Sequence, residues 1–143
     1  MKGKSYELIE HTADVGIRLK AKDLKGLFKN AALAMFEIMA EQKSKVKGQR
    51  SKVKKIVIRQ KADNLEELFI NWLNELLSLS ATKELIFFDF KIEKLDKNNL
   101  QATAVGEAIK NYRVNTEIKA ATYHQLQLKQ SESGCLAEVI FDV

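Results

Sequence analysis

The chain has 143 residues, of which 45% are hydrophobic and 30% charged, and its formal net charge is +5 at pH 7. A chain of this length can bury one substantial core but not two independent ones, so we expect a single domain over residues 1–143. The composition excludes an intrinsically disordered chain. No segment approaches the ~18 consecutive apolar residues of a membrane helix, and we therefore expect a cytoplasmic protein with no membrane partner.

Alternating apolar and polar residues predict two β-strands near the N-terminus, at residues 6–10 and 15–20. A short polar connection joins them. Asp23 then offers a helix N-cap, and apolar residues recur at intervals of three and four from Leu24 onward. This spacing predicts an amphipathic helix that ends near Gln42.

Residues 43–55 form a basic segment that contains seven lysines or arginines and no acidic residue. A solvated linker is the simpler interpretation of such a run. Contact with RNA or with an acidic protein is the alternative, and the net charge permits it.

The rest of the chain predicts a second helix and several more strands. Residues 63–66 have the spacing of a capping box, and an apolar stripe with Trp72 as a core residue follows them. Alternation predicts a strand before this helix and antiparallel strands after it, which we place at residues 55–59, 88–93, 100–104, 118–128 and 136–141. Two helices among roughly seven strands predict an α+β fold with mainly antiparallel pairing.

Few residues belong to a recognisable chemical motif. Glycine-rich phosphate loops, GxSxG, HExxH and CxxC are all absent, which disfavours an ordinary nucleotide-binding enzyme or hydrolase. His11 and Asp14 lie between two strands, where side chains can point away from the core; alternatively, Asp14 only shapes the turn. Asp142 stands beside the terminal carboxylate, and such adjacent oxygens suit calcium or magnesium. The alternative there is a frayed chain end.

Four segments carry a resemblance that extends over nearly the whole chain. They are HTADVGI at residues 11–17, NWLNELL at 71–77, TEIKAATYH at 116–124 and FDV at 141–143. In this order they resemble the archease family, and the resemblance runs from Tyr6 to Val143. It implies an α/β sandwich of the strand-helix-strand-strand kind, in which two amphipathic helices pack against a mainly antiparallel sheet.

The resemblance also implies a function and a set of site residues. The expected protein is not an enzyme but an accessory activator of the RNA-splicing ligase, which joins cyclic-phosphate or 3′-phosphate ends to 5′-hydroxyl ends in tRNA splicing and RNA repair. It would promote guanylylation of the ligase histidine and multiple turnover; the ligase uses the GTP, and tRNA is reached only through the ligase. A divalent cation, calcium or magnesium, is implied at Asp14, Asp142 and the terminal carboxylate of Val143. Side chains implied to face the partner are His11, Lys119, Tyr123 and His124.

Two other functions stay open from the sequence. One is an RNA-binding or chaperone-like module that acts through residues 43–55. The other is a metal-dependent hydrolase that uses Asp14 with His11.

Overall fold

The first helix begins where its sequence places an N-cap. Asp23 Oδ1 accepts a hydrogen bond from the backbone N–H of Gly26 at 2.8 Å, and helix α1 follows as Leu24–Met39. These coordinates come from a computed structural model, which describes residues 6–10, 14–43 and 52–143. The expected end near Gln42 is wrong, because β3 (Ala40–Gln42) leaves the helix to pair with β7 (Tyr112–Val114).

The second helix, α2 (Leu65–Lys83), is capped one residue later than residues 63–66 suggest. Asn64 is the N-cap, and its Oδ1 accepts from the backbone N–H of Glu67 at 2.8 Å. Glu67 Oε1 in turn accepts from the backbone N–H of Asp63 at 3.3 Å, one residue before the N-cap, so the reciprocal bond resembles that of a capping box but is shifted by one residue. The helix ends at Glu84, whose φ of 54° is left-handed and stops further helical bonding.

The remaining strands form two larger antiparallel sheets. The four-stranded sheet has the order β1-β2-β9-β8, and its strands are Tyr6–Glu10, Asp14–Ala21, Gly134–Asp142 and Ala120–Ser131. The three-stranded sheet has the order β4-β6-β5, and its strands are Lys54–Lys61, Asn99–Ala108 and Leu85–Leu95. A short 3₁₀ helix, Ile109–Asn111, leads from β6 into β7.

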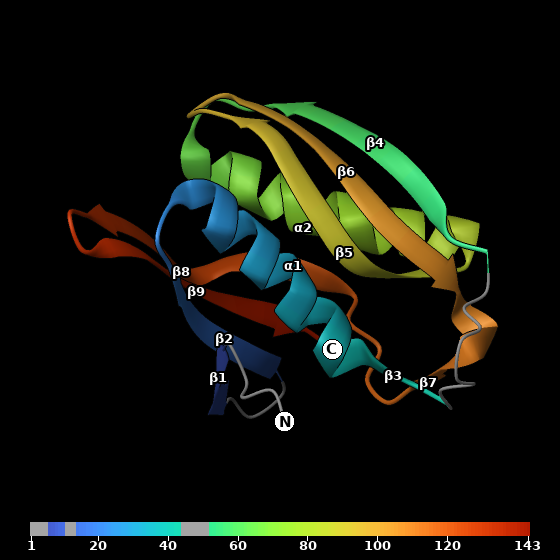
Figure 1. Cartoon of the computed structure of the whole chain (residues 1–143). Helices are drawn as coiled ribbons and strands as arrows, with labels where there is room; N and C mark the ends of the chain where they lie inside the picture. The colour runs from blue at the N-terminus through green and yellow to red at the C-terminus, as the bar shows by residue number, and fades with distance from the viewer. Residues whose placement is uncertain (1–5, 11–13, 44–51) are drawn as a thin grey trace.

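The two helices lie between these sheets (Figure 1). Helix α1 packs against β2 on one side and β5 on the other, and α2 packs against β8 on one side and against β5 and β4 on the other. This arrangement confirms the expected α+β class with antiparallel pairing. The described residues hold nine strands, and the short pair β3–β7 is the part that alternation did not predict. Neither helix of this part of the chain is long and apolar enough to cross a membrane.

Aromatic packing ties the two helices together. Trp72 is fully buried, and its Nε1–H donates to the backbone oxygen of Phe28 at 2.9 Å, which confirms it as a core residue. Phe28 also meets Phe69 edge to face, with ring centroids 5.1 Å apart. Replacing a buried residue such as Trp72 by alanine costs about 3–5 kcal/mol.

Candidate functional site

Alternate residues of the four-stranded sheet point away from the helices and form rows across its outer face. In one row Arg18 of β2 stands between Glu7 of β1 and Glu138 of β9, which are its partners in register. Arg18 Nη1 lies 3.5 Å from Glu7 Oε2, and Nη2 lies 3.2 Å from Glu138 Oε1. One cation therefore neutralises two carboxylates, as cross-strand pairing favours.

Four residues further along the same strands, a second acidic row differs from the first. Asp14 of β2 and Asp142 of β9 are direct register partners, so their side chains lie on one face with Cβ atoms about 4.5–5.5 Å apart. Neither carboxylate makes a hydrogen bond or ion pair within the described residues. Like charges directly opposite each other are destabilising. A cation between the two carboxylates would remove that cost.

The segment that contains Lys119 lies on the other side of Asp142. Ala120 of β8 is the register partner of Asp142, and the backbone N–H of Lys119 donates to the backbone oxygen of Asp142 at 2.8 Å. Lys119 itself is exposed. The end of β9 is thus flanked by Asp14 on one neighbouring strand and by residues 119–120 on the other.

Helix α2 fixes this segment through Asn74. The side-chain oxygen of Asn74 accepts from the backbone N–H of Ala121 at 2.7 Å, and its Nδ2 donates to the backbone oxygen of Ala121 at 3.1 Å. The amide group therefore takes the place of a further strand at the edge of the sheet. Asn74 was not among the expected site residues, although it belongs to the NWLNELL segment and is a polar side chain between the core residues Leu73 and Leu76.

A large bulge follows in β8. Five residue steps from Thr122 to Gln127 face only two steps from Ile140 to Glu138 on β9, so β8 carries three more residues than a regular ladder needs. Gln125 has a φ of 53° inside this bulge, which is strained for a residue with a side chain.

The bulge presents Tyr123 and His124 to solvent. Tyr123 is 55% exposed, and His124 is exposed as well. The backbone N–H of His124 donates to Thr122 Oγ1 at 3.3 Å, and Thr122 Oγ1 donates to the backbone oxygen of Ile140 at 2.9 Å. Partial burial and then the negative charge of Glu67 raise the pKa of Tyr123.

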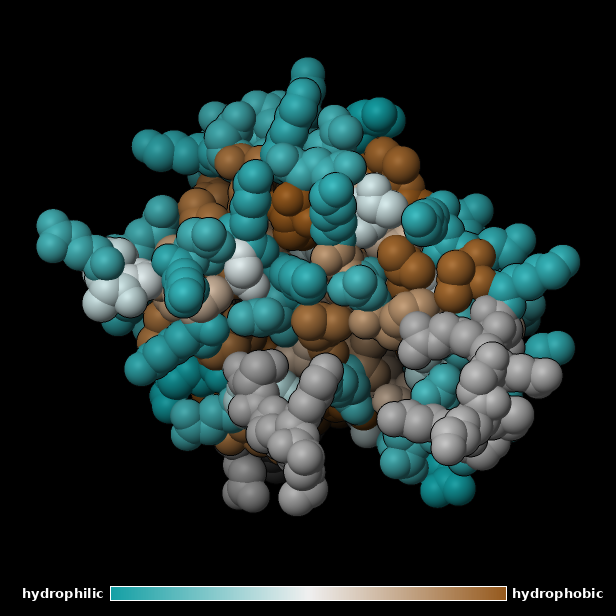
Figure 2. All heavy atoms as spheres, viewed as in Figure 1, coloured by the Kyte–Doolittle hydropathy of each residue, from teal (hydrophilic) through white to brown (hydrophobic). Residues whose placement is uncertain are grey.

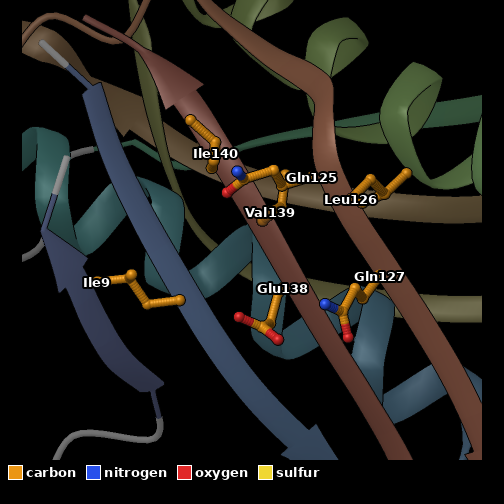
Figure 3. A pocket seen from close by; sticks show the side chains of 7 residues that line it. All are labelled: Ile9, Gln125, Leu126, Gln127, Glu138, Val139 and Ile140. Atoms are coloured by element: carbon orange, nitrogen blue, oxygen red, sulfur yellow. The ribbon is translucent and has the colours of Figure 1, made fainter.

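A hollow of about 300 Å³ lies beside the bulge, between β8, β9 and β1 (Figure 3). Gln127 of β8 and Glu138 of β9 lie side by side at one end of it. Ile140 also lines it and is only 4% exposed, although it lies on the outer face with Asp142. Gln125 lines the same hollow, so the bulge covers part of the sheet next to the acidic pair.

Most of the residues expected at the site therefore lie around one end of β9. These residues are Asp14, Lys119, Tyr123, His124 and Asp142, with the partly buried Val143 after them. His11 lies outside the described residues. Within the described ranges no three His, Cys, Asp or Glu side chains are grouped as a metal site. A cation at the acidic pair would thus need further oxygens, such as the terminal carboxylate.

Comparisons with known proteins show which family this chain belongs to. A model of the "Archease protein family (MTH1598/TM1083)" matches residues 6–143. Protein archease of Methanosarcina barkeri is 36% identical over 147 aligned residues, which cover 99% of this chain and 97% of that protein. Protein archease of Saccharolobus islandicus is 37% identical, with 98% and 99% covered.

Solved structures show the same fold. The solution structure of Methanobacterium thermoautotrophicum protein 1598 superimposes with a TM-score of 0.73 at 29% identity, and covers 99% of this chain and 100% of that chain. The crystal structure of an archease, described as a possible chaperone, from Thermotoga maritima superimposes with a TM-score of 0.67 at 21% identity, over 94% of both chains.

The fold thus defines an α+β protein whose two helices lie between antiparallel sheets, a class that both solved structures share over nearly their whole length. The chain belongs to the archease family, which confirms the resemblance seen in its sequence.

Proposed function

We propose that this protein is a non-catalytic activator of the RNA-splicing ligase. It binds the ligase with the end of β9 and the bulge of β8, promotes guanylylation of the ligase histidine, and so allows the ligase to turn over repeatedly. Lys119, Tyr123 and His124 face the partner. The ligase, not this chain, consumes GTP and joins the RNA ends of a spliced tRNA.

One observation supports this proposal more than any other. Segments that are far apart in the sequence meet at the end of β9: Asp14 pairs with Asp142, Lys119 bonds to Asp142, and Asn74 bonds to Ala121. Each of these four segments supplies an exposed or partly exposed polar side chain there. Loop and edge residues held by a rigid scaffold are where binding residues gather.

The acidic pair suits a divalent cation. Asp14 and Asp142 supply hard carboxylate oxygens from neighbouring strands, and calcium and magnesium prefer such ligands. We propose that these two side chains and the terminal carboxylate of Val143 hold the ion. Its positive charge would offset the repulsion between the carboxylates and fix the ends of β2 and β9 for the partner.

A multiple-turnover assay tests the proposed function. The ligase is mixed with GTP and an excess of cleaved RNA that carries a cyclic phosphate and a 5′-hydroxyl, with and without this protein. We expect product to exceed the amount of ligase only when the protein is present, and Asp14→Asn to remove that effect.

Two outcomes would contradict the proposal. If product stays equal to the ligase whether or not the protein is added, it is not an activator. If RNA is consumed by this protein alone, the hydrolase interpretation replaces it.

A further inference from the structure

Strand β4 is an edge of the three-stranded sheet, on the opposite side of the helices from the acidic pair (Figure 1). It carries four exposed cations, which are Lys54, Lys55, Arg59 and Lys61. Figure 2 shows hydrophilic side chains along this side of the molecule, with hydrophobic patches between them. Lysines on an edge strand also discourage strand-to-strand aggregation. A binding role for them must therefore be argued from the residues around them.

A hollow of about 420 Å³ borders one end of β4. Three cations line it, Arg59, Lys61 and Lys94, together with the amide side chains of Asn99 and Gln101 and with Gln60 and Leu100. Arg59 and Lys94 are both register partners of Gln101, one from each neighbouring strand, so they flank it across the sheet. No carboxylate lines this hollow.

A second hollow, of about 400 Å³, borders the other end of β4. Its lining contains Lys54, Lys55 and Lys83, and again no carboxylate. At ~3.3 Å per residue, the strand places Lys55 about 20 Å from Lys61. We call these six cations the β4 strip: Lys54, Lys55, Arg59, Lys61, Lys83 and Lys94.

No residue of the β4 strip forms an ion pair within the part of the chain that the structure describes. Three acids of β5 and of the turn that follows it make other interactions, and one of them, Glu93, accepts a hydrogen bond from Thr103 Oγ1 at 3.4 Å. Asp89 pairs with Lys29 at 3.5 Å, and Asp96 Oδ1 accepts hydrogen bonds from the backbone of its own turn. The positive charge of the strip is therefore available to a ligand.

We propose that the β4 strip binds the phosphate backbone of a structured RNA. Lysine, arginine and amide side chains are the usual contacts to phosphate oxygens, and a track about 20 Å long spans several phosphates of a helix. The lining of the two hollows contains no aromatic ring on which a base could stack. The strip therefore recognises backbone charge rather than base sequence.

The choice of RNA over another polyanion rests on the proposed function, because an activator of an RNA ligase works beside RNA ends. The strip and the acidic pair lie on different sheets with the helices between them. One molecule could therefore hold RNA on β4 while its other side contacts the ligase.

Fluorescence anisotropy with a labelled RNA stem-loop and the full chain tests this inference without the ligase. The test variant is Arg59→Gln, Lys61→Gln, Lys94→Gln, which removes three cations from one hollow. The matched control is Lys20→Gln, Lys22→Gln, Lys129→Gln, which removes the same charge from exposed residues of other elements. A DNA duplex and polyglutamate serve as competing polyanions.

We expect the test variant to bind RNA at least about tenfold more weakly than the control, and its plot of log affinity against log salt to be shallower by about two to three. Equal losses in both variants, salt-independent binding, or tighter binding to DNA or polyglutamate would overturn the inference. Loss of RNA binding with intact ligase activation would leave the proposed function standing, whereas the reverse result would overturn the proposed function alone.

Discussion

Asp14 and Asp142 face each other across neighbouring antiparallel strands, and no cationic side chain of the described residues pairs with either of them, whereas four residues along the same strands Arg18 neutralises both of its acidic neighbours. The sheet thus neutralises the carboxylates of one row with an arginine, whereas the two carboxylates of the next row repel each other. A fold selected only for stability would gain by changing either aspartate. The pair therefore suggests a role that requires both charges.

Replacing one of these charges should stabilise the metal-free protein. In EDTA we expect Asp14→Asn to raise the free energy of unfolding by about 0.2–1 kcal/mol, because it removes a like-charge cross-strand pair. The same variant should lose the rise in Tm that calcium or magnesium gives the wild type, since only a bound ion stabilises by mass action. Thermal unfolding with and without each metal measures both effects.

Asp63→Asn is the matched control, because Asp63 is exposed and its side chain makes no hydrogen bond or ion pair with described residues. It should keep the metal-dependent rise in Tm. A metal-free Asp14→Asn that is less stable than wild type, or one that still responds to metal, would make Asp14 a structural residue.

The side-chain amide of Asn74 should contribute the free energy of two hydrogen bonds to the stability of the fold. Asn74→Ala leaves the backbone N–H and oxygen of Ala121 without their side-chain partner, and at about 0.5–1.5 kcal/mol for each bond the loss should be about 1–3 kcal/mol. Hydrogen exchange of the Ala121 amide should accelerate more than that of its neighbours in β9.

Asn71→Ala on the same helix tests whether this effect is specific. The Asn71 side chain makes no hydrogen bond within the described residues, and the bond from Gln60 Nε2 goes to the Asn71 backbone oxygen, which the substitution keeps. Similar exchange at Ala121 in both variants would show that Asn74 merely adds general helix stability.

Acid should weaken the turn between β5 and β6. Hydrogen bonds from the backbone of Asn98, the side chain of Asn99 and the backbone of Asn99 hold the pKa of Asp96 below its usual value of 3.8. A carboxyl whose pKa is lowered by folding stabilises at pH above its unfolded pKa, and that contribution is lost as the pH falls through the folded pKa. The stability difference between wild type and Asp96→Ala should therefore shrink below about pH 4. Urea unfolding over this range checks it, and a difference independent of pH would contradict it.

Much of the fold follows from periodicity in the sequence. Val15, Ile17 and Leu19 alternate with polar residues, and two of them, Ile17 and Leu19, are buried where β2 faces the helices. The short strand β3 could not be found in this way. Residues Ala40–Gln42 follow the helix directly, and only pairing with the distant Tyr112–Val114 turns them into a strand.

The bulge in β8 was also hidden. Leu126 and Leu128 keep an apolar-polar alternation that reads as one regular strand, and no glycine or asparagine marks the left-handed position at Gln125. Asn74 was equally hidden, since its two bonds go to backbone groups 47 residues away. The periodicity of apolar residues indicates which face of a strand is buried. It does not indicate where a strand contains a bulge, or which side-chain amide bonds to the edge of a sheet.

Deleting the bulge of β8 should affect ligase activation without reducing the stability of the fold. Removing residues 123–125 leaves Thr122 opposite Ile140, places Leu126 opposite Val139 on the core side, and keeps Gln127 opposite Glu138. The ladder becomes regular and the left-handed Gln125, whose conformation costs roughly 1–2 kcal/mol, is gone. We therefore expect the deletion variant to be at least as stable as wild type and to keep its Tm response to metal, because Asp14 and Asp142 are untouched.

The same deletion should abolish ligase activation, because it removes the exposed Tyr123 and His124 together with the backbone that presents them. The double variant Tyr123→Ala, His124→Ala is the comparison variant, since it keeps the bulge and removes only the two side chains. Loss of turnover in both variants would assign the contact to these side chains; loss in the deletion alone would assign it to the shape of the bulge. Full activation by a folded deletion variant would show that the ligase does not contact this part of β8, and the partner-facing residues would then have to lie nearer Lys119 and the acidic pair.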